Sequence, residues 1–363
     1  MEEEYSDVEE HEELEELQAL NDLFVQNNPN TRRVYLRMDL FTLFADDEDF
    51  RFRFRLPRFL VVSLYSRIEH KLLNTKRNNA VAPMNRLLLT LRIYATGAFL
   101  GVGADMINMA NTTAGRIFHK VTKHICEEAV GIIKFPKTEE ELNDVSGKFF
   151  QRGGLPGVIG LIDCTHVPII SPGGDFAEVW RNRKGFFSFN VQAIVNYDLM
   201  FTDVVARWQG SCHDSTIFDN CHKRAVLETD QRYSGRYLLG DGAYQNRSYI
   251  ITPVLDPDTP AKQLFNQAHI VLRNRIERTF GVYKRRFPIC KLGLRFKIGN
   301  SANVVVATMT LHNLCMMVGD DVPPELDVAV LAGFNNYQEV PVNNNNGPLT
   351  GEEVRNALIA LFA

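Results

Sequence analysis

The sequence predicts a helical region of about 100 residues followed by a mixed α/β region. Apolar residues recur at helical spacing between residues 57 and 130, which is typical of amphipathic helices. From about residue 150 the pattern changes to short apolar runs of strand length, with helical segments between them but no regular strand–helix–strand repetition. Hydrophobic residues make up 45% of the 363 residues and charged residues 23%, so the chain has ample material for a core. Its length suggests two domains.

The helical region begins with two strong helix signals. Residues 50–56 alternate Phe and Arg and are expected to form an extended lead-in or edge segment. Pro57 then fits the first turn of a helix, whose apolar residues are Leu60, Leu64, Ile68 and Leu72. After a polar stretch at 74–80, a second helix is predicted to begin near Pro83. Its apolar residues are Met84, Leu87, Leu88, Leu91, Tyr94, Ala95 and Ala98.

The next segment resembles a helix-turn-helix. A short helix is expected over 104–110, after Gly101-Val102-Gly103, with a cap at 111–113 and a longer helix over 113–130. The long helix places Ile117, Val121, Ile125 and Ala129 on one face. Its basic residues Arg116, Lys120 and Lys123 are candidate DNA-binding residues. A plain helical bundle explains the same pattern, because basic residues on an exposed helix face are common.

Four strands and several helices are predicted after residue 150. The strands are expected over 157–163, 186–196, 199–208 and 236–241, the second and third joined by a tight turn at Tyr197-Asp198. The helices are expected over 214–226, 269–287 and 304–318. The C-terminal segment contains Pro323-Pro324 and an Asn run at 343–346, and then a short helix with a capping-box start at Thr350 and Glu353.

Charge is unevenly distributed along the chain. Residues 1–31 are expected to be a tail, with a short amphipathic helix through Leu14, Leu17, Leu20 and Phe24. Residues 1–16 contain ten acidic residues and no Lys or Arg, and the remainder has 34 acidic and 40 basic residues, a net charge of +6. A basic body suits a polyanion partner. A solubilising tail on a neutral globule explains the charge equally well.

Several classes of protein are not expected. No apolar run reaches the roughly 18 residues that span a bilayer, so no membrane association is predicted. The acidic first residues do not form a secretory signal. The six cysteines contain no CxxC pair, which favours reduced thiols inside a cell over a disulfide framework.

Two aspartates follow apolar strands. Asp163 and Asp241 each stand where a predicted strand stops, and strand ends of α/β sheets meet in a shared crevice. A carboxylate next to buried apolar residues is costly unless a cation compensates it, either Arg or Lys or a metal ion. Asp214 is a third candidate, although an N-cap role explains it as well.

A glutamate completes the set of candidate carboxylates. Glu277 is the only acidic residue between 273 and 297, a segment with nine basic residues. Helical spacing places Arg273, Glu277, Gly281 and Lys284 on one face, where Gly281 would leave room for a large ligand. Glu277 alone would be read as a surface salt-bridge residue. Together with the aspartates it predicts a site for two hard divalent cations, which can assist phosphodiester cleavage. The surrounding cations, including Arg273 and Lys284, would attract a DNA backbone.

Six motifs together resemble the PIF/Harbinger family of DDE transposases and the nucleases derived from them. The likeness runs from about residue 55 to 318. The motifs are Gly157-Val-Ile-Gly-Leu-Ile-Asp-Cys-Thr-His-Val-Pro-Ile169, Asn182-Arg-Lys-Gly-Phe-Phe-Ser-Phe-Asn190, Trp208-Gln-Gly-Ser-Cys-His-Asp-Ser215, Leu238-Leu-Gly-Asp-Gly-Ala-Tyr244, Asn274-Arg-Ile-Glu-Arg-Thr-Phe280 and Leu311-His-Asn-Leu314.

The resemblance implies a ribonuclease-H-like mixed sheet flanked by helices, with catalytic roles for Asp163, Asp241 and Glu277 and an added metal-ligand role for Asp214. It implies Mg²⁺ or Mn²⁺ as cofactor, DNA as substrate, and work in the nucleus with some protein in the cytoplasm. A Myb-like DNA-binding partner that assists nuclear import is expected from the family. Arg183 and Lys184 would then contact the DNA backbone near the site. The oligomeric state stays open.

The predicted organisation has four parts. Residues 1–31 form the acidic tail, 32–150 the helix-turn-helix-like DNA-binding region, 151–318 the nuclease domain, and 319–363 a polar segment with a terminal helix.

Three other functions could be read from the sequence. A DNA-binding adaptor that keeps the fold without catalysis is the main alternative, although all the acidic residues are present. A zinc site could use Cys212, His213, Cys221 and His222, but the spacing fits no common zinc-finger pattern. Thiol catalysis by Cys164 is disfavoured, because its place at an apolar strand end explains this cysteine more simply.

Overall fold

The computed structural model describes residues 39–73, 80–320 and 350–363, and these residues belong to one compact unit. The predicted acidic tail with its amphipathic helix, most of the polar stretch at 74–80, Pro323-Pro324 and the Asn run at 343–346 lie outside the described residues. Among the residues described, no helix has the length and apolar character needed to cross a membrane.

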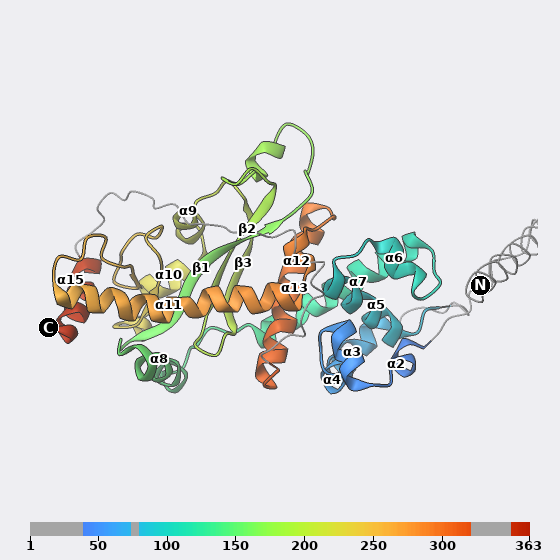
Figure 1. Ribbon diagram of the computed structural model, residues 1–363, viewed down its shortest axis with the longest axis horizontal. Coiled ribbons are helices and arrows are strands. Elements are labelled where there is room, and N and C mark those ends of the chain that lie inside the picture. Colours follow the sequence, from blue (N-terminus) through green and yellow to red (C-terminus); the bar gives the residue numbers. More distant parts are fainter. Residues whose placement is uncertain (1–38, 74–79, 321–349) are drawn as a thin grey trace, which may run out of the picture. The chain divides into compact units, whose positions relative to one another are not determined.

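Helices make up the first part of the unit (Figure 1). They are α2 (Leu40–Leu43), α3 (Asp47–Phe54), α4 (Arg58–Leu72), α5 (Pro83–Thr96), α6 (Leu100–Asp105), α7 (Asn111–Ile132) and α8 (Glu139–Gly153). The predictions of α4, α5 and α7 are confirmed, and the four apolar residues predicted for α4 are all buried. Helix α8 was not anticipated, although the sequence carries its capping box, Thr138 with Glu141.

The expected extended segment at 50–56 is wrong, because most of it belongs to helix α3. Asp46 caps the helix by accepting a hydrogen bond from the Asp49 N–H, and the acidic first turn suits the positive end of the helix dipole. Phe50 and Phe54, four positions apart, are both buried on one face. The Phe–Arg alternation hid this helical pair, because Phe52 is an additional, exposed aromatic residue.

The helix-turn-helix-like segment is shifted from its predicted limits. The short helix is Leu100–Asp105 and not 104–110, and α7 starts at Asn111 after the N-cap residue Ala110, so 111–113 form its first turn and not a cap. Gly103 lies inside the short helix. A glycine suits this position because a Cβ there would come 3.0 Å from the Leu89 Cδ1 of α5.

A five-stranded mixed sheet forms the second part, with the order β3-β2-β1-β4-β5. Its strands are β1 (Val158–Pro168), β2 (Ser188–Val195), β3 (Phe201–Gln209), β4 (Tyr237–Leu239) and β5 (Ile250–Ile251). Strands β1, β2 and β3 pair antiparallel, whereas β4 runs parallel to both β1 and β5. The predicted β2–β3 hairpin is confirmed. Strand β1 does not stop at Asp163 as expected, since its pairing with β2 continues to Pro168.

Helices of the second part follow and flank the sheet. They are α9 (Asp214–Asp219), α10 (His222–Thr229), α11 (Pro260–Arg286), α12 (Ile289–Leu292), α13 (Ile298–Met317) and α15 (Thr350–Ile359), with short 3₁₀ helices η1 (Ala177–Trp180), η2 (Gln231–Tyr233) and η3 (Ala360–Phe362). The single helix predicted over 214–226 is wrong: the chain breaks at Asn220, and Cys221 caps α10. Helix α11 begins nine residues before its predicted start, where Thr259 accepts a hydrogen bond from the Lys262 N–H.

The two faces of the sheet are covered by different helices. Alternate residues of a strand point to opposite faces. Ile162 belongs to an apolar cluster with Phe218 of α9, while Leu161 joins the larger core that includes residues of α11 and α13. Figure 1 shows α11 crossing the strands of the sheet. Asp163 and Thr165 follow Leu161 at strand spacing and therefore face α11.

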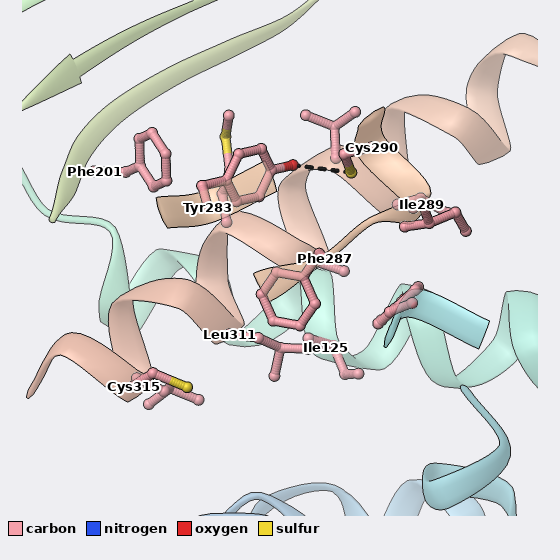
Figure 2. Close-up of a cluster of buried hydrophobic side chains, with 14 of the residues drawn as sticks. Ile125, Phe201, Tyr283, Phe287, Ile289, Cys290, Leu311 and Cys315 are labelled. Atoms are coloured by element: carbon pink, nitrogen blue, oxygen red, sulfur yellow. Dashed lines mark hydrogen bonds between the residues drawn. The ribbon is translucent and has the colours of Figure 1, made fainter. Parts of the chain in front are cut away.

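The larger core continues from the sheet into the N-terminal helices (Figure 2). Tyr283 and Phe287 of α11 lie between Phe201 of β3 and Ile125 of α7 in this view. The Tyr283 hydroxyl donates a hydrogen bond to the Cys290 Sγ at 3.1 Å and also lies 2.8 Å from the Thr308 Oγ1, so this buried polar group is satisfied. The predicted boundary near residue 150 is therefore crossed by shared core packing.

A buried ion pair joins the same two parts. Arg286 at the end of α11 is fully buried, and its Nη1 lies 2.8 Å from the Asp320 Oδ2. The same carboxylate pairs with Arg51 of α3, and Arg286 also donates to the carbonyl of Arg55 at 3.1 Å. Two arginines from distant segments thus depend on one aspartate.

We predict that Asp320→Ala lowers the free energy of unfolding by about 3–5 kcal/mol, because it leaves the buried Arg286 guanidinium without its counter-charge. Urea unfolding followed by circular dichroism measures the change. Asp49→Ala is the matched control, since Asp49 forms an exposed pair with Arg53 and its loss should cost less than about 1 kcal/mol. Equal effects of the two substitutions would contradict the prediction.

Candidate active site

Asp163 lies at the centre of the candidate site, in the middle of β1. Its Oδ2 accepts a hydrogen bond from the Arg273 Nη1 at 3.0 Å, and its Oδ1 accepts one from the Cys164 N–H at 2.7 Å. The Asp163 side chain is only 14% exposed. The pleat of β1 turns it toward α11, which supplies the arginine.

Negative charges converge on Asp163. The pKa of Asp163 is raised to about 7: burial is the largest cause, the nearby Arg273 guanidinium lowers the pKa, and the charges of Asp241 and Asp214 raise it. Charges act on a buried carboxylate over several ångströms, so Asp241 and Asp214 lie in the same region as Asp163. The charges of the three aspartates that the sequence analysis selected therefore act on one another.

Asp214 is the first residue of α9, where His213 and not Asp214 is the N-cap residue. The alternative N-cap role of Asp214 is therefore wrong. Its Oδ1 accepts a hydrogen bond of 2.8 Å from the Asn190 Nδ2. Burial is the main cause that raises the pKa of Asp214, the Asn190 hydrogen bond lowers it, and the Asp241 charge raises it.

Asn190 is a residue of the site to which the sequence analysis gave no role. It lies on β2 opposite His166 of β1, and its Nδ2 also donates to the carbonyl of Cys212 at 2.8 Å. Its Oδ1 is buried and has no hydrogen-bond partner among the described residues. The sequence feature that could have identified Asn190 is a polar amide at a buried strand position between Phe189 and Val191.

Strand β4 ends at Leu239, so Asp241 lies one residue beyond it and not at the end of a strand over 236–241 as predicted. Its Oδ1 accepts a hydrogen bond from the Ala243 N–H at 3.0 Å, which closes a tight turn. The intervening Gly240 permits close packing, because a Cβ there would lie 3.0 Å from the Tyr244 Cδ2. The turn holds the Asp241 carboxylate beside the end of the parallel β1–β4 pair.

Glu277 is linked to Asp163 through Arg273. The Arg273 Nη2 lies 3.1 Å from the Glu277 Oε1, one helical turn along α11. The Glu277 side chain is 53% exposed, whereas that of Arg273 is 11% exposed. In the part of the chain that the structure describes, no three His, Cys, Asp or Glu side chains are already placed to hold a metal ion.

Lys284 contacts β1 beyond the carboxylates. Its Nζ donates to the Thr165 Oγ1 at 2.7 Å and to the His166 carbonyl at 2.8 Å. Burial lowers the pKa of Lys284 to about 8. The proposed DNA contacts of Arg273 and Lys284 stay predictions, since both side chains are turned inward. Around Gly281 the expected open space is present, because a Cβ there would meet nothing within 4 Å.

The remaining predicted basic residues are exposed. Arg183 and Lys184 lie in the connection between β1 and β2, and their charges, after burial and the charge of Lys284, help to lower the pKa of His166 to about 4. They therefore lie near the site. Arg116, Lys120 and Lys123 are exposed on α7 at helical spacing, which gives one basic stripe.

The alternative chemistries find no geometric support in the described segments. The four residues of the proposed zinc site do not form a group that could hold a metal ion among the residues placed. Cys164 lies close to the Tyr244 hydroxyl, at 3.4 Å, and burial raises the pKa of its thiol well above the ordinary value. A thiol of this kind is a poor nucleophile.

Residues 162–313 match the DDE superfamily endonuclease family. The chain is 30% identical over 251 residues to the "Putative nuclease HARBI1" of Homo sapiens. The matched residues cover 68% of this chain and 71% of that protein. The chain belongs to the Harbinger-derived DDE family. The "Protein ALP1-like" of Arabidopsis thaliana is 25% identical over 67% of this chain and 63% of its own length. No solved structure matches the chain significantly.

The range that matches the family contains all four candidate carboxylates. The matched range begins at Ile162, one residue before Asp163, and ends after Glu277 and most of α13. The resemblance stated from the sequence motifs is confirmed. The roles of the individual residues stay predictions.

We predict that Asp163→Asn changes how stability depends on pH. The folded protein holds a proton on Asp163 up to about pH 7, whereas the unfolded chain releases it near pH 4, so wild-type stability falls as pH rises between these values. The asparagine cannot ionise. The free energy of unfolding of the variant minus that of the wild type should therefore grow over this range, by at most about 4 kcal/mol.

Urea unfolding in EDTA at pH 4.5 to 8 measures this difference. Asp230→Asn is the control, because Asp230 is paired at the surface with Arg232. Parallel pH profiles of the wild type and Asp163→Asn would show that Asp163 titrates normally.

Proposed function

We propose that this protein is an endonuclease that hydrolyses DNA phosphodiester bonds with Mg²⁺ or Mn²⁺ held by Asp163, Asp214, Asp241 and Glu277. Its family supports a nuclease or transposase-like role. The observation that carries the proposal is that Asp163 and Asp214, from distant segments, both have a raised pKa, caused mainly by burial and increased by the charge of Asp241.

We further propose that the catalytic fold is ribonuclease-H-like. The support is the sheet order β3-β2-β1-β4-β5, with an antiparallel β1–β2–β3 meander and β4 parallel to β1. This arrangement places the central Asp163 beside the strand that leads to Asp241. Helix α11 then crosses the same face with Glu277.

The donor set fits a hard divalent cation. Carboxylate oxygens are preferred ligands of Mg²⁺ and Mn²⁺. The unpartnered Asn190 Oδ1 next to Asp214 adds one oxygen that the described residues leave unsatisfied. A bound cation would supply Lewis-acid stabilisation of the phosphodiester and activation of the attacking water.

The chain's own residues would position these groups. Asn190 fixes the Asp214 carboxylate from β2, and the turn at Ala243 fixes that of Asp241. Lys284 fixes β1 just beyond Asp163 by its hydrogen bonds to Thr165 and His166. Arg183 and Lys184 would attract the DNA backbone to the opening of the site. If a DNA 3′-hydroxyl replaces water as nucleophile, the same carboxylates would serve strand transfer.

DNA recognition outside the site is assigned to the helical region. The exposed stripe of Arg116, Lys120 and Lys123 on α7 follows a short helix, as in a helix-turn-helix. A Myb-like partner protein would share recognition and assist nuclear entry. These two roles rest on the family resemblance.

We predict that Asp163→Asn, Asp241→Asn and Glu277→Gln each lower the rate of Mg²⁺-dependent nicking of supercoiled DNA by about 100-fold or more, because each removes a ligand charge. DNA affinity should stay within severalfold of the wild type. Nicking assays in Mg²⁺, Mn²⁺ or EDTA, with and without a candidate Myb-like partner, measure the rate, and gel shifts measure binding.

Asp203→Asn is a matched control. Asp203 is a partly buried aspartate on β3 that pairs with Lys223 and is not one of the four proposed metal ligands. Its substitution should leave nicking unchanged. A wild type that binds DNA without cutting it in any metal would instead favour the DNA-binding adaptor.

We predict that replacing Arg116, Lys120 and Lys123 by Gln weakens DNA binding at every sequence and reduces the slope of log affinity against log salt by about one per lost phosphate contact. Fluorescence anisotropy across a salt series measures this. The control replaces three cations that are paired at the surface, Lys148, Arg232 and Lys262. An equal loss in the control would assign the effect to net charge and not to the α7 stripe.

A further inference from the structure

One side chain bridges two of the proposed metal ligands. The Arg273 guanidinium lies between two of the carboxylates, with Nη1 at 3.0 Å from the Asp163 Oδ2 and Nη2 at 3.1 Å from the Glu277 Oε1. Asp163 is on β1 and Glu277 is on α11, and the arginine bridges the two elements. The Arg273 side chain is 11% exposed, so it is largely buried.

In the metal-free protein, the Arg273 guanidinium compensates part of the negative charge of the site. A poorly solvated carboxylate needs a compensating cation, and Asp163 has other acidic groups nearby. Arginine is suited to this task because its planar group offers separate donors to two carboxylates at once. Arg273 therefore neutralises a site whose ligands would otherwise repel one another.

The same contacts oppose a divalent cation. A hard metal ion needs direct contact with carboxylate oxygens at about 2.0–2.6 Å. A guanidinium held between Asp163 and Glu277 separates the two ligands and repels the incoming charge. This agrees with the finding that no three candidate ligand side chains in the described part of the chain are already arranged around a common point.

We propose that Arg273 is an internal competitor for the metal site: its guanidinium holds Asp163 and Glu277 until a divalent cation displaces it from at least one of them. The inference rests on the proposed metal-dependent function and adds a closed state to it. In this state the protein keeps its carboxylates compensated, and occupancy of the site requires the arginine to move.

The neighbouring cations of α11 do not have this role. Arg275 donates to the Tyr197 carbonyl at 2.9 Å and lies over the Tyr197 ring, and Lys284 binds Thr165 and the His166 carbonyl. Arg278 is exposed and directly follows Glu277 in sequence. It thus offers a control that removes the same charge from the same helix, because Arg278 forms no hydrogen bond or ion pair with Asp163 in the described part of the chain.

The test is the affinity of the full-length protein for Mn²⁺, measured by isothermal titration calorimetry or by electron paramagnetic resonance of free Mn²⁺. Wild type, Arg273→Gln, Arg273→Lys, Arg278→Gln and Asp163→Asn are compared after EDTA treatment. Arg273→Gln should bind Mn²⁺ about 5- to 150-fold more tightly than the wild type, the usual range for coupling between two competing interactions. Arg278→Gln should change affinity far less, because an exposed charge is screened.

A second measurement guards against misfolding of the glutamine variant. In EDTA, Arg273→Gln should have a lower melting temperature than the wild type. Saturating Mn²⁺ should raise the melting temperature of the variant by more than it raises that of the wild type. Arg273→Lys keeps the charge but loses the fork that bridges two carboxylates, so its Mn²⁺ affinity should lie between those of the wild type and Arg273→Gln.

Each outcome decides something. If Arg273→Gln binds Mn²⁺ no more tightly than Arg278→Gln, or more weakly than the wild type, Arg273 does not compete with metal, and the proposed function is untouched. If neither the wild type nor any variant binds Mn²⁺, the metal-dependent function fails and the inference fails with it. Binding that Asp163→Asn leaves intact would place the metal elsewhere and overturn both.

Discussion

Compensation of the Asp163 charge is the constraint on which the site depends. The carboxylate is enclosed between the sheet and α11, and Asp214 and Asp241 add negative charge beside it. One guanidinium, that of Arg273, offsets part of this charge in the structure. A site with more buried negative charge than positive charge favours the uptake of a cation, and this is the physical basis of the proposed metal-dependent chemistry.

Helix α11 connects this charge balance to the rest of the fold. Its 27 residues carry Arg273 and Glu277 at the site, and then Lys284, which binds β1. At its end, Arg286 is buried against Asp320 and the backbone of α3. The position of the catalytic candidates on the sheet is thus tied to the packing of the N-terminal helices, since one continuous helix contacts both.

Sequence patterns predicted helices and strands well where one periodicity was clear, as in α4 with its four buried apolar residues. They failed where two patterns overlapped. Residues 50–56 alternate like a strand, yet burial of Phe50 and Phe54 against the helical core makes the segment part of α3. The break between α9 and α10 was missed because the side chains on both sides are compatible with one helix, and packing of Cys221 selects the interruption.

The sequence by itself determined the order of elements, the family, and which acidic residues are candidates, because these depend on local residue patterns and on the order and spacing of the motifs. It did not determine that Asn190 supports Asp214, or that Arg273 stands between Asp163 and Glu277. Those contacts join residues 24 and 110 positions apart or orient a side chain within a helix. Only the packing of α11 on β1 and the register of β2 decide which long side chain reaches which carboxylate.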